Sequence, residues 1–235
     1  MGKGKLQKFQ ENATFNHVIE PDIKGHVTQN HPLKGNWKKT FFKNQNPIIL
    51  ELGCGKGEYS VGLARKFADK NFIGVDIKGA RIWKGAKISF EEKLTNIAFL
   101  RTQIEMINSF FDENEVDEIW ITFPDPQMKK RRAKKRLTSS GFLLRYQKIL
   151  KHNGVVHLKT DSLFLYKYTN AVVNLNNLPI IKNSPNLYAE NWVDEILSIK
   201  TYYEKLHIDE GDAINYISFN LNKNCELKEP DFEMN

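Results

Sequence analysis

The sequence predicts an α/β fold, in which a mostly parallel sheet of seven strands carries helices on both faces. From residue 48 onward, short apolar runs of strand length alternate with segments that have the apolar spacing of a helix. The first of these runs breaks directly into a glycine-rich turn and then a helical segment. Such alternation is typical of a parallel sheet whose ligands bind beyond the carboxyl ends of the strands.

The expected elements follow from these periods. Thr138 is the expected N-cap of a sheet-covering helix over 137–151, and Asn153-Gly154 is expected to end it. Besides the helix after the glycine turn, helices are expected over 82–90 and 104–111. The expected strands are 48–52, 72–76, 97–102, 118–123, 155–161, 180–188 and 213–221.

The glycine turn predicts a binding loop for a nucleotide-type cofactor. Gly53, Gly55 and Gly57 stand at alternate positions, which is neither the G-x-G-x-x-G of dinucleotide sites nor the Walker pattern of triphosphate sites. Glu51 precedes the turn by two residues, where a carboxylate can face a cationic amino group such as that of S-adenosylmethionine (SAM). The acid-x-Gly-x-Gly-x-Gly pattern resembles motif I of the class I SAM-dependent methyltransferases.

A second carboxylate supports this interpretation. Asp76 ends the next apolar run, about twenty residues past the glycine turn, which is the offset at which a carboxylate binds ribose hydroxyls. The alternative is a plain glycine turn followed by a helix-capping aspartate. Thr102 and Gln103 end the third predicted strand, where class I methyltransferases hold adenine, and are the candidates for that contact.

Composition restricts the possible partners. The 235-residue chain has a net charge of +7 and a pI near 9.2, which favours a polyanionic partner. Its two cysteines lack the spacing of a zinc site, so no metal is predicted. No signal peptide or run of membrane-spanning length appears, so a cytoplasmic protein without a membrane partner is expected.

Three regions are expected along the chain. Residues 1–45 form a lysine-rich extension whose aromatic side chains lack a clear period, so that part of it is expected to dock on the domain as irregular backbone. Residues 46–222 form the catalytic domain, and residues 223–235 an acidic tail. Whether the extension contacts RNA or is a solvated tail stays open.

The fourth predicted strand runs into a proline-flanked aspartate and a dense basic run. Pro124 and Pro126 fix the backbone around Asp125 at the tip of the strand, beside the expected cofactor crevice. Seven of the eight residues from Lys129 to Arg136 are basic. A solvated loop is one explanation, but the position at the rim of the site favours phosphate binding.

These residues resemble the signature of the tRNA (guanine-N7)-methyltransferase family, roughly FPDPWxKxRHxKRRL. The family's late Thr-x-x-Glu motif has its counterpart in Thr201-Tyr202-Tyr203-Glu204, so the resemblance spans roughly residues 45–221. The chain departs from the family pattern in having Gln127 for the usual Trp, Arg132 for His, and Asp76 for the commoner Glu.

The resemblance implies a Rossmann-like class I methyltransferase that transfers the methyl group of SAM to N7 of a tRNA guanosine, at position 46 of the variable loop. Because N7-methylated guanine is cationic, a carboxylate beside it would stabilise the transition state, so Asp125 is the expected catalytic residue and is also expected to contact the cofactor. The cofactor residues would be Glu51, Gly53, Gly55, Asp76, Thr102, Gln103 and Asp125. The substrate residues would be Lys129, Asp161, Thr201, Tyr202, Tyr203 and Glu204, and the phosphate contacts Lys130, Arg131, Arg132, Lys134, Lys135 and Arg136.

Other functions stay open at this stage. The chain could methylate another RNA base, or it could be a non-catalytic RNA-binding protein on the same scaffold. An oxidoreductase with an atypical glycine loop is a third alternative, and capping of the following helix by Asp161 or Ser162 is compatible with substrate binding. The sequence does not distinguish a monomer from a homodimer.

Overall fold

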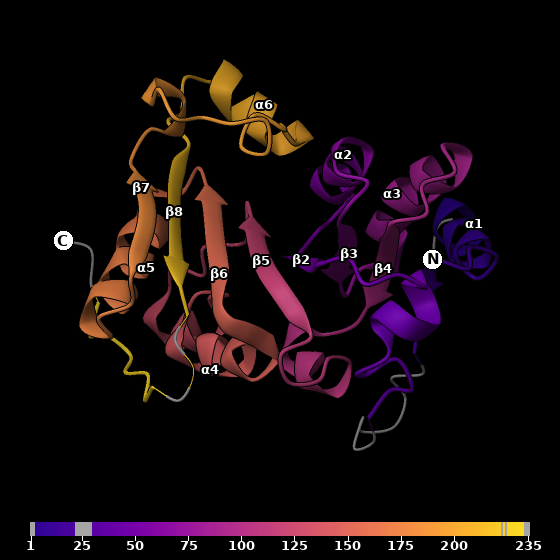
Figure 1. The fold of residues 1–235 in the computed structure, drawn as a ribbon. Coiled ribbons are helices and arrows are strands. Elements are labelled where there is room, and N and C mark those ends of the chain that lie inside the picture. The colour runs from indigo at the N-terminus through magenta and orange to yellow at the C-terminus, as the bar shows by residue number, and fades with distance from the viewer. Residues whose placement is uncertain (1–2, 22–29, 222, 224, 233–235) are drawn as a thin grey trace.

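A computed structural model describes residues 3–21, 30–221, 223 and 225–232. Within them, one sheet has the strand order β1-β4-β3-β2-β5-β6-β8-β7 (Figure 1). Every neighbouring pair is parallel except the two pairs that involve β8, which is antiparallel to both β6 and β7. The predicted fold class is confirmed, and the sheet has eight strands because the two-residue β1 adds an edge next to β4.

Alternate residues of the central strands point to two different layers. Ile48 and Leu50 belong to one buried apolar cluster, while Ile49 between them belongs to the other. Burial on both faces explains why this strand is a continuous apolar run. The strands are β1 Val18–Ile19, β2 Ile48–Leu52, β3 Asn71–Asp76, β4 Ile97–Arg101, β5 Val116–Thr122, β6 Leu150–Thr160, β7 Ile180–Ser184 and β8 Asn215–Asn220.

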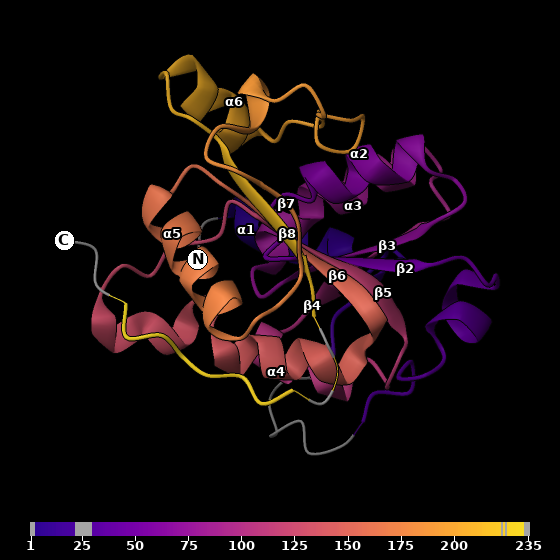
Figure 2. The same cartoon turned by 60° about the vertical axis from the view of Figure 1, so that its left-hand side comes forward.

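Helices cover both faces of the sheet (Figure 2). The α-helices are α1 Lys3–Asn12, α2 Glu58–Lys66, α3 Gly79–Glu91, α4 Ser140–Ile149, α5 Leu163–Leu175 and α6 Tyr202–Asp209. Four shorter helical turns are η1 Trp37–Phe42, η2 Ile104–Ser109, η3 Lys130–Lys135 and η4 Leu187–Ala189. α4 and α5 pack on the face of the first cluster, and α2 and α3 on that of the second. No helix among the described residues has the length and apolarity that crossing a membrane requires.

The N-terminal extension is more regular than its sequence predicted. α1 packs along α3, with the Asn12 side-chain amide donating to the Gly79 carbonyl at 3.0 Å and the Trp83 indole donating to Glu11 at 2.6 Å. The C-terminal end of the helix is therefore held by polar contacts, which an apolar period cannot reveal. Residues 22–29 of the extension and 233–235 of the acidic tail lie outside the described residues.

Several predicted boundaries are wrong. α4 begins after Ser139, because the Thr138 hydroxyl is buried against that of Thr169 at 2.7 Å. Asn153 and Gly154 do not end a helix: β6 already begins at Leu150, and they lie in an irregularity between the pairs Val116–Leu150 and Glu118–Val155. The strands predicted over 180–188 and 213–221 are shorter, at 180–184 and 215–220.

Candidate active site

The glycine turn joins β2 to α2 in a conformation that only glycine adopts readily. Gly53, Gly55 and Gly57 have φ values of 79°, 55° and 68°. A Cβ on Gly57 would lie 2.5 Å from the ring of Phe99, so this position also needs the smallest side chain for packing. The turn therefore brings its backbone close to whatever occupies the end of the sheet.

Asp76, the last residue of β3, holds this turn in place. One carboxylate oxygen accepts a hydrogen bond from the Gly55 amide at 2.9 Å, and the other accepts one from the Lys78 amide at 2.7 Å. A carboxylate can accept about four hydrogen bonds, so capacity remains for the hydroxyl groups of a ligand.

Glu51 is buried below the turn, with 3% of its surface exposed. Its carboxylate accepts hydrogen bonds from the Ser60 amide at 2.9 Å, the Ser60 hydroxyl at 2.5 Å and the Thr122 hydroxyl at 2.7 Å. Burial raises the pKa of Glu51 to about 7, although these hydrogen bonds oppose the rise. Among the described residues no cation lies within ion-pair distance of it.

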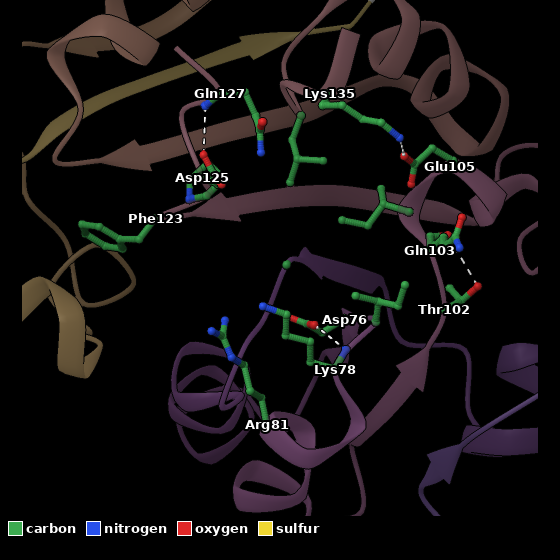
Figure 3. Close-up of a pocket in the computed structure, with 15 residues that line it drawn as sticks. Asp76, Lys78, Arg81, Thr102, Gln103, Glu105, Phe123, Asp125, Gln127 and Lys135 are labelled. Atoms are coloured by element: carbon green, nitrogen blue, oxygen red, sulfur yellow. Dashed lines mark hydrogen bonds and ion pairs between the residues drawn. The ribbon is translucent and has the colours of Figure 1, made fainter. Parts of the chain in front are cut away.

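A cavity of about 510 Å³ opens at the carboxyl ends of the strands, within the size range of small-molecule sites. Figure 3 shows Asp76, Lys78 and Arg81 on one wall, with Asp125 and Gln127 on the opposite wall. Of the predicted residues, the cavity brings together Gly53, Asp76, Thr102, Gln103, Asp125 and Lys135. Glu51, Gly55, Lys129, Asp161 and the 201–204 segment do not line it.

The chain is strained where it presents Asp125. Phe123 and Gln127 both have positive φ values, 49° and 48°. Such conformations cost about 1–3 kcal/mol each in side-chain-bearing residues and cluster at functional sites. The Gln127 amide donates to the Asp125 carboxylate at 3.0 Å, and the Phe123 amide donates to the Lys159 carbonyl at 2.8 Å. These bonds fix the turn and aim Asp125 at the cavity.

Sequence reasoning missed part of the lining. Ile77, Ile104 and Leu137 give the cavity apolar walls, and Ile77 keeps 47% of its side chain exposed there. Lys78 and Arg81 add two cations. Ile77 could have been found from the sequence, because it is an apolar residue directly after Asp76 at the end of a strand. Leu137 is the last residue of the family signature, but the signature alone does not indicate that it lines the cavity.

The basic run forms η3 at the edge of this cavity. Lys129, Lys130, Arg131, Arg132, Lys134 and Lys135 are exposed, and Lys135 pairs with Glu105 at 2.7 Å. Arg136 differs because it is buried: its guanidinium lies over the rings of Phe164 and Tyr168, at 4.8 and 4.4 Å, and donates to the Gln127 carbonyl at 3.2 Å. A phosphate cannot reach Arg136 in this structure.

The 201–204 motif begins α6. The Thr201 hydroxyl accepts from the Glu204 amide and the Glu204 carboxylate accepts from the Thr201 amide, which is a capping box. Glu204 is fully buried and pairs with Lys159 of β6 at 2.7 Å, so it holds α6 over the sheet instead of facing a ligand. Tyr202 and Tyr203 are exposed.

Asp161 follows β6 and is half-buried. The cap of α5 is Ser162, whose hydroxyl accepts from the Leu165 amide at 3.2 Å. Asp161 instead lies 3.6 Å from the His207 imidazole of α6. His207, Glu210 and Asp212 have ligand atoms within 4.8 Å of one another, but this group is separate from the residues that line the cavity.

The sequence and the fold have counterparts among known proteins. Residues 45–216 match the family described as "Putative methyltransferase". A tRNA (guanine-N(7)-)-methyltransferase of Bacteroides fragilis is 54% identical over 100% of this chain and 92% of its own length. The protein of that name from Porphyromonas gingivalis is 53% identical over 94% of this chain and 91% of its own length. The one from Levilactobacillus brevis is 36% identical over 82% and 88%.

Solved structures resemble the chain in fold alone. The 16S rRNA methyltransferase KamB has a TM-score of 0.60 at 13% identity, covering 78% of this chain and 92% of that one. The 16S rRNA (adenine(1408)-N(1))-methyltransferase from Catenulisporales acidiphilia has a TM-score of 0.57 at 12% identity, covering 83% and 94%. The relatives that match over nearly the whole chain confirm the predicted resemblance: the chain belongs to the tRNA (guanine-N7)-methyltransferase family.

Proposed function

We propose that this protein transfers the methyl group of SAM to N7 of a guanosine in tRNA. The observation that carries the proposal is the cavity at the end of the sheet, which has Asp76 on one wall, Asp125 on the opposite wall and exposed cations of η3 at its edge. The identity of 50–54% with four relatives named for this activity supports it. We expect the enzyme to act in the cytoplasm, where tRNA is available.

The lining of the cavity fits SAM. The spare acceptor capacity of Asp76 suits the two ribose hydroxyls, while Ile77 and Leu137 offer apolar surface to the adenine ring. Thr102 and Gln103 are the proposed polar contacts of the adenine edge. Gly53 and Gly55 would approach the methionine part, and Glu51 behind them would supply negative charge for its ammonium group. When bound, SAM supplies an electrophilic methyl group on a sulfonium sulfur.

The reaction needs little proton chemistry from the protein. Guanine N7 carries a lone pair in the plane of the ring and no proton, so the protein needs no general base. Its task is to hold N7 in line with the methyl group, which can supply much of the rate. The base becomes cationic as the bond forms, so a fixed carboxylate beside it stabilises the transition state more than the ground state. Asp125, aimed at the cavity by its strained turn, is the proposed catalytic residue and also borders the cofactor.

Substrate RNA would lie along the basic edge of the cavity. We propose phosphate contacts for Lys130, Arg131, Arg132, Lys134 and Lys135, and contacts with the guanosine and its backbone for Lys129, Asp161, Thr201, Tyr202 and Tyr203. We assign Arg136 and Glu204 supporting roles, because both are buried and already paired within the protein.

The decisive experiment is incubation with an unmodified tRNA transcript and methyl-labelled SAM, followed by digestion to nucleosides. We expect labelled 7-methylguanosine. A matched transcript with adenosine in place of guanosine 46 in the variable loop should accept no label, which tests the proposed position. Label on another nucleoside would overturn the choice of atom, and SAM binding without any labelled product would favour a non-catalytic RNA-binding protein.

A further inference from the structure

A second hollow lies further along α3 from the cavity. We call it the α6 groove; it measures about 270 Å³ and lies between α2, α3 and the start of α6. Its lining residues are Lys56, Glu58, Val61, Arg65, Lys84, Gly85, Ile88, Lys200, Tyr202 and Lys205. None of its cations belongs to the basic run of η3.

The α6 groove is strongly cationic. Among the described residues it is lined by five cations and one carboxylate, Glu58. Glu58 pairs with Lys84 at 3.3 Å, and Arg65 pairs with Glu92 at 2.5 Å. No carboxylate of the described chain pairs with the three remaining cations, Lys56, Lys200 and Lys205. The groove therefore keeps a positive charge that an anionic ligand can match.

Two tyrosines stand beside these cations. Tyr202 and Tyr203 are 55% and 48% exposed, and their rings lie edge to face, 5.6 Å apart at 76°. The Lys56 ammonium lies 4.6 Å from the centre of the Tyr202 ring and 5.6 Å from that of Tyr203. Exposed aromatic rings beside a positively charged groove are the combination that binds unpaired nucleotides, since bases stack on the rings while the cations hold phosphates.

The α6 groove lies next to the catalytic cavity along α3. Arg81 lines the cavity and Lys84 lines the groove, one turn further along the same helix. Lys56 belongs to the glycine turn, whose Gly53 lines the cavity. In Figure 1, α6 lies beyond the carboxyl ends of β5 and β6, and the Tyr202 amide at its start donates to the Glu58 carboxylate of α2 at 2.8 Å. A chain that passes the cavity can thus continue along α3 into the groove.

We propose that the α6 groove binds the phosphodiester backbone of the substrate RNA, with Tyr202 or Tyr203 stacking on a base. The RNA would then be held on both sides of the cavity, by η3 on one side and by the α6 groove on the other. This inference rests on the proposed function. It assigns a role to Lys200 and Lys205, which the family signature does not cover.

The test compares two double variants that each remove two positive charges. K200Q/K205Q changes the groove, and K148Q/K167Q changes exposed lysines of α4 and α5, on the other face of the sheet. The affinity for an unmodified tRNA transcript is measured by fluorescence anisotropy from low to moderate salt. For the groove variant we expect about tenfold weaker binding at low salt and a log-log salt slope that is less steep by about 1–2. The control should match the wild type, and SAM affinity should be unchanged in both.

Two outcomes would overturn the inference, and they are distinguishable. If the wild type binds and methylates tRNA while the two variants have the same affinity and salt slope, the groove makes no phosphate contact and the proposed function still stands. If the wild type neither binds nor methylates tRNA, the proposed function fails and the inference fails with it.

Discussion

Two buried glutamates, Glu51 and Glu204, differ in whether the fold itself supplies a positively charged partner. Glu204 has Lys159 at 2.7 Å, and the Tyr188 hydroxyl donates to it at 2.5 Å. Glu51 receives hydrogen bonds from Ser60 and Thr122 only, and no cation of the described chain pairs with it. Both residues belong to motifs that predicted contact with a ligand.

The difference separates a structural carboxylate from one that can serve a ligand. The charge of Glu204 is neutralised within the fold, where Lys159 also donates to the Leu197 carbonyl at 2.8 Å and so fixes the segment before α6. A buried carboxylate without a cation is costly to ionise, which is why burial raises the pKa of Glu51 to about 7. A cationic ligand would remove that cost, which is why we propose that Glu51 serves the ammonium group of SAM.

Of the changes proposed for the two glutamates, breaking the ion pair between Lys159 and Glu204 should have the largest effect on stability. Glu204→Gln keeps the shape of the side chain but leaves Lys159 buried and unpaired, which should lower the free energy of unfolding by about 3–5 kcal/mol. Chemical denaturation measures it. Glu210→Gln, an exposed change next to the same helix, should stay within about 0.5 kcal/mol. Equal losses in the two variants would mean that the buried pair does not hold α6.

Because Lys159→Met/Glu204→Leu replaces both charges with apolar groups, it should recover much of the stability that Glu204→Gln loses. Failure to recover would indicate that the capping box formed by Thr201 and Glu204 contributes more than the ion pair.

The pH dependence of stability should report on Glu51. Its pKa in the folded protein, about 7, lies above the ordinary value of 4.5, so the folded state binds this proton more tightly than the unfolded chain. The stabilisation is therefore complete below about pH 4.5 and is lost as the pH rises through 7, amounting to about 3 kcal/mol. The measurement is the free energy of unfolding from pH 4.5 to 8, taken as wild type minus Glu51→Gln. A difference that does not change with pH would contradict the raised pKa.

Removing the charge of Glu51 should also weaken the binding of SAM, by a smaller free energy than its effect on stability. Glu51→Gln can keep the hydrogen bonds to Ser60 and Thr122, because a hydroxyl both donates and accepts, but it loses the negative charge. At pH 8 we expect SAM binding to weaken by about 1.5–3 kcal/mol, measured by calorimetry. The folded Glu204→Gln protein is the matched control and should bind SAM nearly as well as the wild type. The reverse pattern would exchange the roles of the two glutamates.

The sequence predicted the parts of this molecule that local patterns determine. Apolar alternation predicted the sheet, and the glycine turn and Asp76 marked the end of it where the cavity lies. The two prolines around Asp125 predicted a fixed turn, and the structure adds the positive φ values of Phe123 and Gln127. Which of these residues contact SAM and RNA stays a prediction.

What the sequence could not predict depends on partners far along the chain. Arg136 looks like its basic neighbours, but it is buried by rings of α5. In the sequence, nothing next to Glu204 indicates a partner, but in the fold β6 places Lys159 at 2.7 Å from it. The docking of α1 on α3 was not predictable from an apolar stripe, since side-chain hydrogen bonds hold its C-terminal end there.

The measurement that tests the central claim most directly is the methylation rate of Asp125→Asn at saturating SAM and tRNA. Asparagine keeps the oxygen that accepts from the Gln127 amide but removes the charge. We expect kcat to fall by about 10²–10³, with the affinity for both ligands nearly unchanged, because the carboxylate acts mainly on charge that develops in the transition state. A rate close to that of the wild type would contradict the assignment of Asp125 as the catalytic residue.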